Sequence, residues 1–457
     1  MESTPQLRRL DLMLRTGCLL MENGADTSRT LRLMKRVALL YGIPEKHLHI
    51  YVNYNILMAN LSYPDHSYTK FQRIEKHEIN LNVIRELSIL TMETVRQDCP
   101  PDVFEQHLDR IDNMKRQYSP WQVALGGGLA CGGFCVQFGG DWQAFFYASL
   151  AAMLGLRLRE WLGRKGNNKY VNIGIVAFVS TLLAWIFGMI SESIASAVPQ
   201  LSALYSDTPW HALMACALFI VPGVPLINFI SDMLSDFTQV GITRAVNTLA
   251  ILIAMAFGIG FAIQVCGIDN FVRDLTMVPH HAYVTYMVAA AISAVGFSFI
   301  FNVPRHLLWV VAIGGIIAIC TRNFVSLGPS SGNIGLDFGP IVGTFVGSVL
   351  VSVIVCSIVR RTHTPHQCLS IPSVIPMIPG VLMYRALFAF INMHGVVGEV
   401  TVAVNNAIQS SLIILCIALG VAIPNIFFRR MISPRREREM LENLIKRYQQ
   451  QANEGED

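Results

Sequence analysis

The sequence predicts a mainly α-helical integral membrane protein: ten transmembrane helices as two five-helix inverted repeats, preceded by a small α/β cytosolic domain. Three observations lead to this fold class. The 457 residues are 53% hydrophobic and only 14% charged, well below the roughly 25% charged residues of a soluble domain. Beyond residue 118, apolar stretches long enough to cross a bilayer follow one another with few charges inside them. Two of these stretches contain proline–glycine interruptions at matching places.

Residues 1–118 are expected to form the cytosolic domain. Apolar residues recur at helical spacing from Leu7 to Met21, and the next helix can be capped by Asp26 or Thr27. Alternating residues between positions 47 and 74 predict two or three strands. Two further helices are expected at about 80–96 and 102–118.

Charge supports ten spans. If the N-terminal domain is cytoplasmic, the predicted inside loops and the tail as far as Arg438 carry fourteen lysines and arginines, whereas the outside loops carry only Arg273 and Arg322. This asymmetry agrees with the positive-inside rule and places both termini in the cytoplasm. The expected spans are 121–138, 142–160, 171–198, 210–235, 244–266, 281–301, 306–321, 334–359, 369–393 and 401–428.

The spans divide into two repeats, at 119–268 and 279–430, with a cytosolic C-terminal helix or tail at 431–457. The broken fourth span corresponds to the broken ninth. Because five is an odd number, two similarly folded halves must cross the membrane in opposite orientations. Inverted repeats of this kind suit alternating access in transporters.

The two interruptions are the predicted binding site. Pro222, Gly223 and Val224 break the fourth span, and Pro379 and Gly380 break the ninth. Proline removes a backbone donor and disrupts the preceding turn. Freed backbone groups at membrane depth are tolerated only against protein or a water-filled cavity, so we expect the two breaks to meet near the middle of the membrane.

Polar residues near the first break are further candidates. Asn228 and Asp232 follow it by one and two turns and share one helix face with Val224. An ionisable group within a span indicates function by default, and Asp232 is our candidate for proton coupling. A solvated interfacial aspartate is the alternative.

In the second half, Tyr384 and Arg385 lie just beyond the break, where the arginine could hold a substrate carboxylate in a bidentate arrangement. Arg385 could equally form a structural ion pair or extend toward the interface. Asn302, in the Phe-Asn-Val-Pro turn after the sixth span, could bind substrate or cap a helix.

Four stretches carry a resemblance to a known family: MENGAD at 21–26, VPGVPLINFISD at 221–232, VGFSFIFNVP at 295–304 and IPMIPG at 375–380. Together they resemble the threonine/serine exporter family, with its two modules fused in one chain. In some bacteria these modules are separate proteins implicated in succinate export. The resemblance implies proton-driven export of a small amino acid, or alternatively a dicarboxylate, across a bacterial inner membrane.

The sequence contains no motif for nucleotide binding. There is no P-loop or dinucleotide-binding motif, and no cofactor, metal or nucleic acid is expected. The expected partners are the substrate, protons and the lipid bilayer, with a homo-oligomer possible. A channel or a membrane-embedded hydrolase remain alternatives, and no enzyme activity is expected.

Overall fold

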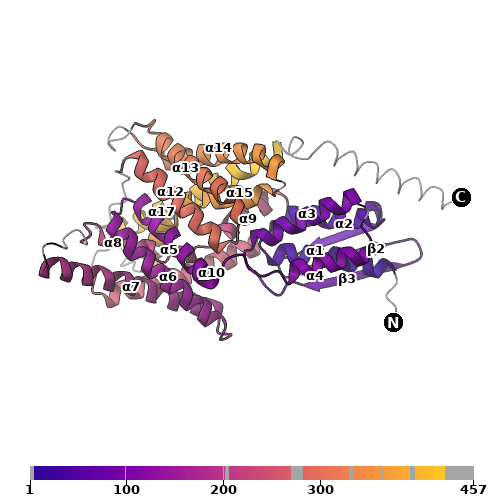
Figure 1. The fold of residues 1–457 in the computed structure, drawn as a ribbon, viewed down its shortest axis with the longest axis horizontal. Coiled ribbons are helices and arrows are strands. Elements are labelled where there is room, and N and C mark those ends of the chain that lie inside the picture. Colours follow the sequence, from indigo (N-terminus) through magenta and orange to yellow (C-terminus); the bar gives the residue numbers. More distant parts are fainter. Residues whose placement is uncertain are drawn as a thin grey trace.

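The computed structural model describes residues 5–97, 99–198, 200, 205–268, 281–328, 334–362, 364–391 and 397–427. An N-terminal domain lies at one end of a large helical part, and the two share an extended boundary (Figure 1). The predicted C-terminal helix or tail at 431–457 lies outside the described residues.

The N-terminal domain packs helices on one face of a three-stranded sheet. Its antiparallel strands lie in the order β1-β2-β3, and α1 contacts β2, β3 and the helices α2, α3 and α4. Leu57, Ala59 and Leu61 alternate along β2 and are fully buried, which explains the period-two pattern. The last helix ends at Asp112, before the predicted residue 118. The elements are α1 (Pro5–Glu22), α2 (Thr27–Leu40), β1 (Leu48–Val52), β2 (Ile56–Ser62), β3 (Ser67–Arg73), α3 (Leu81–Gln97) and α4 (Pro101–Asp112).

The helical part follows the predicted segments closely. The first half consists of α5 (Pro120–Gln137), α6 (Trp142–Gly163), α7 (Lys169–Ala197), α8 (Pro209–Ala215), α9 (Gly223–Leu234) and α10 (Thr238–Val265). The second half consists of α12 (Tyr283–Ile300), α13 (Leu308–Ser326), α14 (Gly339–Thr362), α15 (His366–Val374), α16 (Gly380–Ile391) and α17 (Val397–Phe427).

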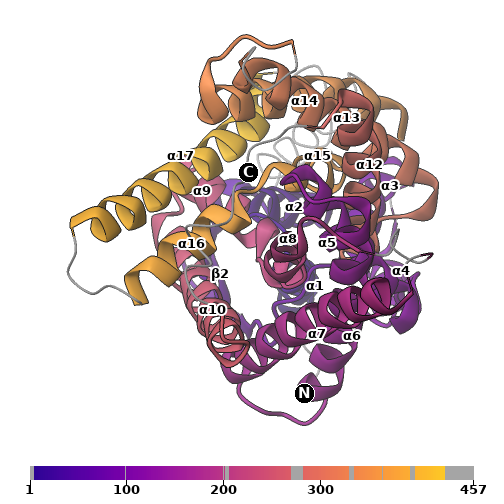
Figure 2. The same ribbon diagram turned by 90° about the vertical axis from the view of Figure 1, so that its left-hand side faces the viewer.

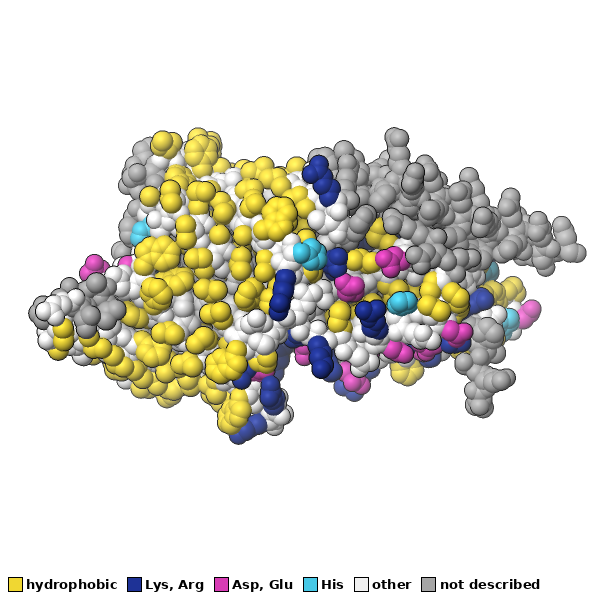
Figure 3. Space-filling model, viewed as in Figure 1, with side chains coloured by type: hydrophobic (Ala, Val, Ile, Leu, Met, Phe, Trp, Pro, Cys, Tyr) yellow, Lys and Arg dark blue, Asp and Glu magenta, His cyan; other side chains and the backbone are white. Residues whose placement is uncertain are grey.

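Among the described residues, six helices are long and apolar enough to cross a membrane, or eight if each bent pair counts as one span. The helices α5 and α6 are not among them. Five glycines lower the hydropathy of α5, and Arg157, Arg159 and Glu160 fall in the last third of α6. Hydrophobic side chains cover the visible face of the helical part, and lysines and arginines gather where it meets the N-terminal domain (Figure 3). This distribution is typical of a membrane protein.

Both predicted breaks are present as bends. The helix pair Pro209–Ile220 and Gly223–Leu234 bends by 57°, and the pair His366–Met377 and Gly380–Ala389 bends by 53°. Each break begins with a short 3₁₀ turn, Leu218–Ile220 in the first half and Ile375–Met377 in the second.

Packing partners correspond between the halves. In the first half α5 contacts α6, α6 contacts α7, α7 contacts α10, and α10 contacts α9. The same series joins α12 to α13, α13 to α14, α14 to α17, and α17 to α16. The halves meet along α5 and α12, where a Cβ on Gly296 would lie 2.5 Å from the Gly126 carbonyl oxygen. The bent helices lie between the two sets of long helices (Figure 2).

Candidate functional site

The two broken helices contact each other at their breaks. A Cβ on Gly223 would lie 2.8 Å from Cδ1 of Ile378, and a Cβ on Gly380 would lie 2.8 Å from Cδ2 of Leu218. The absence of a side chain at Gly223 therefore allows Ile378 of the second break to pack against the first break. The absence of one at Gly380 allows Leu218, just before the first break, to pack against the second. The gap between them is about 10 Å³ and apolar, so the breaks are closed against each other.

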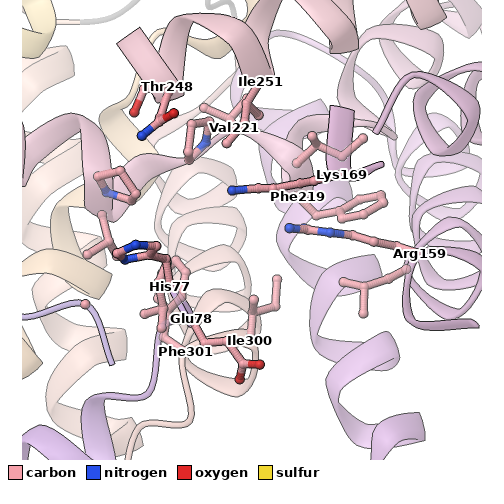
Figure 4. A pocket seen from close by; sticks show the side chains of 18 of the residues that line it. His77, Glu78, Arg159, Lys169, Phe219, Val221, Thr248, Ile251, Ile300 and Phe301 are labelled. Carbon is pink, nitrogen blue, oxygen red and sulfur yellow. The ribbon is translucent and has the colours of Figure 1, made fainter. Parts of the chain in front are cut away.

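A cavity of about 460 Å³ reaches the first break from the side that carries the N-terminal domain, and Val221 lines both this cavity and the small gap between the breaks. Its walls come from the N-terminal domain, from α6, α7 and α10, and from the first break (Figure 4). Of the predicted site residues, Pro222, Val224 and Asn228 line it. Asn228 is 1% exposed, and its Oδ1 has no hydrogen-bond partner among the described residues.

Charged side chains line the cavity unevenly. Its cations are Arg116, Arg159, Lys169 and Arg244, whereas its carboxylates are Glu78 and Glu160. Because Asp232 neutralises Arg244, the balance is three cations against two carboxylates, which favours anions.

His77 contributes no positive charge to this wall near neutral pH. Burial, followed by the charges of Arg244 and Lys169, lowers the pKa of His77 to about 4. The imidazole stacks on Tyr54 with ring centroids 4.0 Å apart, and it is neutral at pH 7.

Asp232 holds the N-terminal domain against the helices. Its Oδ1 accepts a hydrogen bond of 2.9 Å from the Thr27 backbone N–H, and its Oδ2 lies 2.9 Å from Nε of Arg244. The side chains of Asp232 and Arg244 are 0% and 5% exposed. Asp232 does not line the cavity; it lies behind the wall formed by Asn228 and Arg244.

The bonds of Asp232 belong to a larger set centred on residues 24–27, which comprise the end of the turn between α1 and α2 and the first residue of α2. We call these residues the docking turn. Arg244 donates through Nη2 to the Ala25 carbonyl, and Asn228 donates through Nδ2 to the Gly24 carbonyl, both at 2.9 Å. Three polar side chains from α9 and α10 therefore bind this turn.

Asn302 anchors the N-terminal domain at a second place. Its Nδ2 donates to Oδ1 of Asn80 at 2.8 Å, and its Oδ1 accepts from the Gln117 backbone N–H at 2.9 Å. Asn302 has a φ of 55°, in the left-handed region that asparagine tolerates. It is 1% exposed and does not line the cavity.

The second-half candidates lie away from this cavity. Pro379 and Gly380 form the bend, and Gly380 lines the small apolar gap. Tyr384 is 1% exposed, packs against Phe388 with ring centroids 5.6 Å apart, and has no hydrogen-bond partner for its hydroxyl among the described residues. Arg385 follows it on α16 and is half-buried. The structure therefore joins the breaks but leaves Tyr384 and Arg385 outside the cavity wall.

The cations of the cavity carry no distinctive signal in the sequence. Arg159 and Lys169 counted only toward the positive charge of an inside loop, together with Arg164 and Lys165. Only the fold separates these residues, because the first two line the cavity and the last two do not. His77 and Arg116 likewise carried no signal.

Two family models match the chain. A family model described as "Putative threonine/serine exporter" matches residues 11–266, and one described as "Threonine/Serine exporter, ThrE" matches residues 286–427. The chain belongs to the threonine/serine exporter family. Both family modules are present in one chain, and it is a multi-pass membrane protein of a transporter family.

Three relatives illustrate the range of the family. The threonine/serine exporter of Corynebacterium glutamicum is 23% identical over 433 residues, which cover 93% of this chain and 84% of that protein. A probable threonine/serine exporter of Mycobacterium tuberculosis is 21% identical over 398 residues, covering 83% and 70%. The probable succinate transporter subunit YjjP of Escherichia coli is 23% identical over 272 residues, covering 60% of this chain and all of that protein. No solved structure matches the chain.

Proposed function

We propose that this protein is a secondary active exporter of small amino acids of the threonine and serine type, coupled to protons, in a bacterial inner membrane. The observation that carries the proposal is the cavity that leads from the N-terminal domain to the first break, where Pro222 lines it. Immediately beyond, the two breaks close on each other at Gly223 and Gly380. This arrangement is that of a path open toward one side and closed toward the other, with the N-terminal domain and both termini in the cytoplasm.

Ten spans in two inverted repeats account for the architecture. The matching order of packing partners in the halves and the similar bends of 57° and 53° support this assignment. On this model α5 and α6 cross the membrane as well. Their glycines and terminal charges are tolerated because α5 packs against α6 and α12.

The proposed substrate site lies at the end of the cavity next to the first break. Asn228 offers a buried Oδ1 without a partner in the described part of the chain, and a buried acceptor left unpaired costs about 1–3 kcal/mol. The hydroxyl or ammonium of threonine or serine would donate to it. We propose that Gly223 and Gly380 separate when the site opens to the other side, which would bring Pro379, Tyr384 and Arg385 into contact with substrate. Asn302 positions the N-terminal domain.

Asp232 is the proposed proton-coupling residue. Protonation would remove the negative partner of Arg244 and weaken the acceptor used by Thr27. A buried cation without its partner strongly destabilises the conformation that contains it. Proton binding would therefore loosen the docking turn, which also holds Asn228 through Gly24. Protonation of Asp232 would in this way change the position of Asn228 in the cavity wall.

Dicarboxylate export is the second candidate. The cavity carries four cations and two carboxylates, and a relative that aligns over its whole length is described as a probable succinate transporter subunit. Both substrate classes carry a carboxylate, so the cavity accommodates either.

Uptake by inside-out membrane vesicles distinguishes the candidates. Labelled threonine, serine and succinate are offered in parallel to vesicles with and without this protein, each with and without an uncoupler. The proposal predicts uncoupler-sensitive uptake of threonine or serine that requires the protein. Uptake of succinate alone would favour the second candidate, and uptake of none would refute both.

A further inference from the structure

The cavity wall between α6 and α7 carries two cations whose charge the protein does not neutralise. Arg159 lies near the end of α6 and Lys169 begins α7, and their side chains extend into the cavity on either side of Phe219 (Figure 4). Among the described residues, neither side chain forms an ion pair or a hydrogen bond. Phe219 belongs to the 3₁₀ turn that enters the first break, so the pair borders the path to the contact between the breaks.

The other cations at the end of α6 and in the loop that follows it interact with neighbouring side chains. Arg157 and Arg164 both pair with Glu160, the second at 2.8 Å. Lys165 lies 3.7 Å from the ring centroid of Trp161. A general need for positive charge at the membrane surface explains such residues, but it does not explain why Arg159 and Lys169 point into a cavity.

The remaining cations of the cavity each have a partner within the protein. Arg116 donates to the Ile300 carbonyl at 2.5 Å, and Arg244 pairs with Asp232 at 2.9 Å. Two neighbouring cations without a counter-ion repel each other, and a bound anion removes that repulsion.

We propose that Arg159 and Lys169 form a carboxylate-binding subsite of the cavity, which receives the carboxylate of the exported metabolite before it reaches the break. This inference rests on the proposed function and names the chemical group by which the substrate is selected. The arginine guanidinium matches a carboxylate with two parallel donors, and the lysine adds a mobile point charge. The cavity volume of about 460 Å³ falls within the roughly 300–1,000 Å³ of small-molecule sites.

Equilibrium binding to the purified full-length protein tests the subsite. The double variant Arg159→Gln with Lys169→Gln is expected to bind labelled threonine or succinate at least about tenfold more weakly, because two charge-assisted bonds are lost. The matched control is Arg164→Gln with Lys165→Gln. It removes the same charge from the same loop, outside the cavity, and should bind like the wild type.

A second probe varies the ligand instead of the protein. Threonine amide, which lacks the carboxylate, should compete with labelled threonine at least about tenfold more weakly than threonine does. The exchange variant Arg159→Lys with Lys169→Arg keeps both cations and should retain most of the affinity. Each single glutamine variant keeps one cation and should bind with intermediate affinity, which separates loss of the subsite from loss of folding.

The outcomes separate the two proposals. If the wild type transports a labelled substrate but the double variant binds it as tightly as the control, the subsite is refuted and the proposed function stands. Equal competition by threonine amide and threonine would refute the subsite in the same way. A wild-type protein that binds neither threonine nor succinate would overturn both.

Discussion

The carboxylate of Asp232 on α9 lies 2.9 Å from the guanidinium of Arg244 on α10, and both side chains also bind the docking turn of the N-terminal domain. One buried ion pair therefore joins two membrane helices and a domain outside them. The helix α9 begins at the first break, and Asn228, one turn before Asp232, lines the cavity and binds the same turn through the Gly24 carbonyl.

We predict that Asp232→Asn abolishes uncoupler-sensitive export but leaves exchange of labelled for unlabelled substrate partly intact. Asparagine can still accept from Thr27, but it cannot gain and release a proton or neutralise Arg244. Removing one partner of a buried ion pair costs about 3–5 kcal/mol, so the melting temperature should also fall.

The measurement is uptake by inside-out vesicles, compared with Asp236→Asn. Asp236 is exposed and has a φ of 66°, which asparagine tolerates. Full uncoupler-sensitive export by Asp232→Asn would refute the proton assignment.

Substitution of either break glycine should block export and exchange together. A Cβ on Gly223 or Gly380 already meets a side chain of the other break at 2.8 Å, so Gly223→Leu and Gly380→Leu would force the breaks apart or lock them. Gly188 on α7 is the matched control, because nothing lies within 4 Å of a Cβ placed there. Gly188→Leu should transport like the wild type. Normal exchange by both break variants would show that the path does not pass between the breaks.

Asn302→Ala should loosen the N-terminal domain. The change leaves the partly buried Gln117 N–H without its partner and removes one of the two donors to Asn80 Oδ1, which keeps the Val83 N–H at 3.4 Å. Each lost hydrogen bond is worth about 0.5–1.5 kcal/mol. It also places alanine at a positive φ. Thermal unfolding and limited proteolysis between α4 and α5 measure the effect. Asn113→Ala, at an exposed site on the end of α4, is the control. Equal melting temperatures for the two variants would contradict the anchoring role.

Acid should destabilise the protein partly through His77. Its pKa is lowered to about 4 in the folded protein, compared with about 6.5 in an unfolded chain. The unfolded state therefore binds more protons between these values, and the contribution of His77 to stability is lost as the pH falls from about 6.5 to about 4. His77→Gln should make the melting temperature less dependent on pH across this window, whereas His107→Gln at an exposed site on α4 should not. An unchanged pH dependence in His77→Gln would contradict this role.

Local chemistry made much of the fold predictable. Asp26 caps α2 by accepting from the Arg29 N–H at 2.8 Å, as the polar residue before an apolar period indicated. The proline–glycine boxes became bends because proline has no N–H to donate to the turn before it, whereas the Pro222 and Pro379 carbonyls still accept from the Leu226 and Met383 N–H groups at 3.0 Å. The expected shared face of Asn228 and Asp232 is also present, since both contact the docking turn.

The partners of Asp232 and the cations of the cavity could not be predicted, because they depend on contacts between residues far apart in the sequence. The bond from Thr27 to Asp232 joins residues 205 positions apart, and helical periodicity carries no information about such a partner. The residues around Asp232 therefore predict its place on the face of Asn228, but not its contact with the N-terminal domain. Arg159 and Arg164 are both arginines at the C-terminal end of α6. Only the packing of α6 against α7 and α8 places Arg159, and not Arg164, in the wall of the cavity.

We expect protons to drive substrate through the contact between the breaks. Accumulation of labelled threonine is measured in proteoliposomes that contain the full-length protein, under an imposed pH gradient. Threonine should accumulate above its external concentration, and both an uncoupler and Gly380→Leu should prevent this. Equilibration to the external concentration, at a rate that the uncoupler leaves unchanged, would contradict it and indicate a channel.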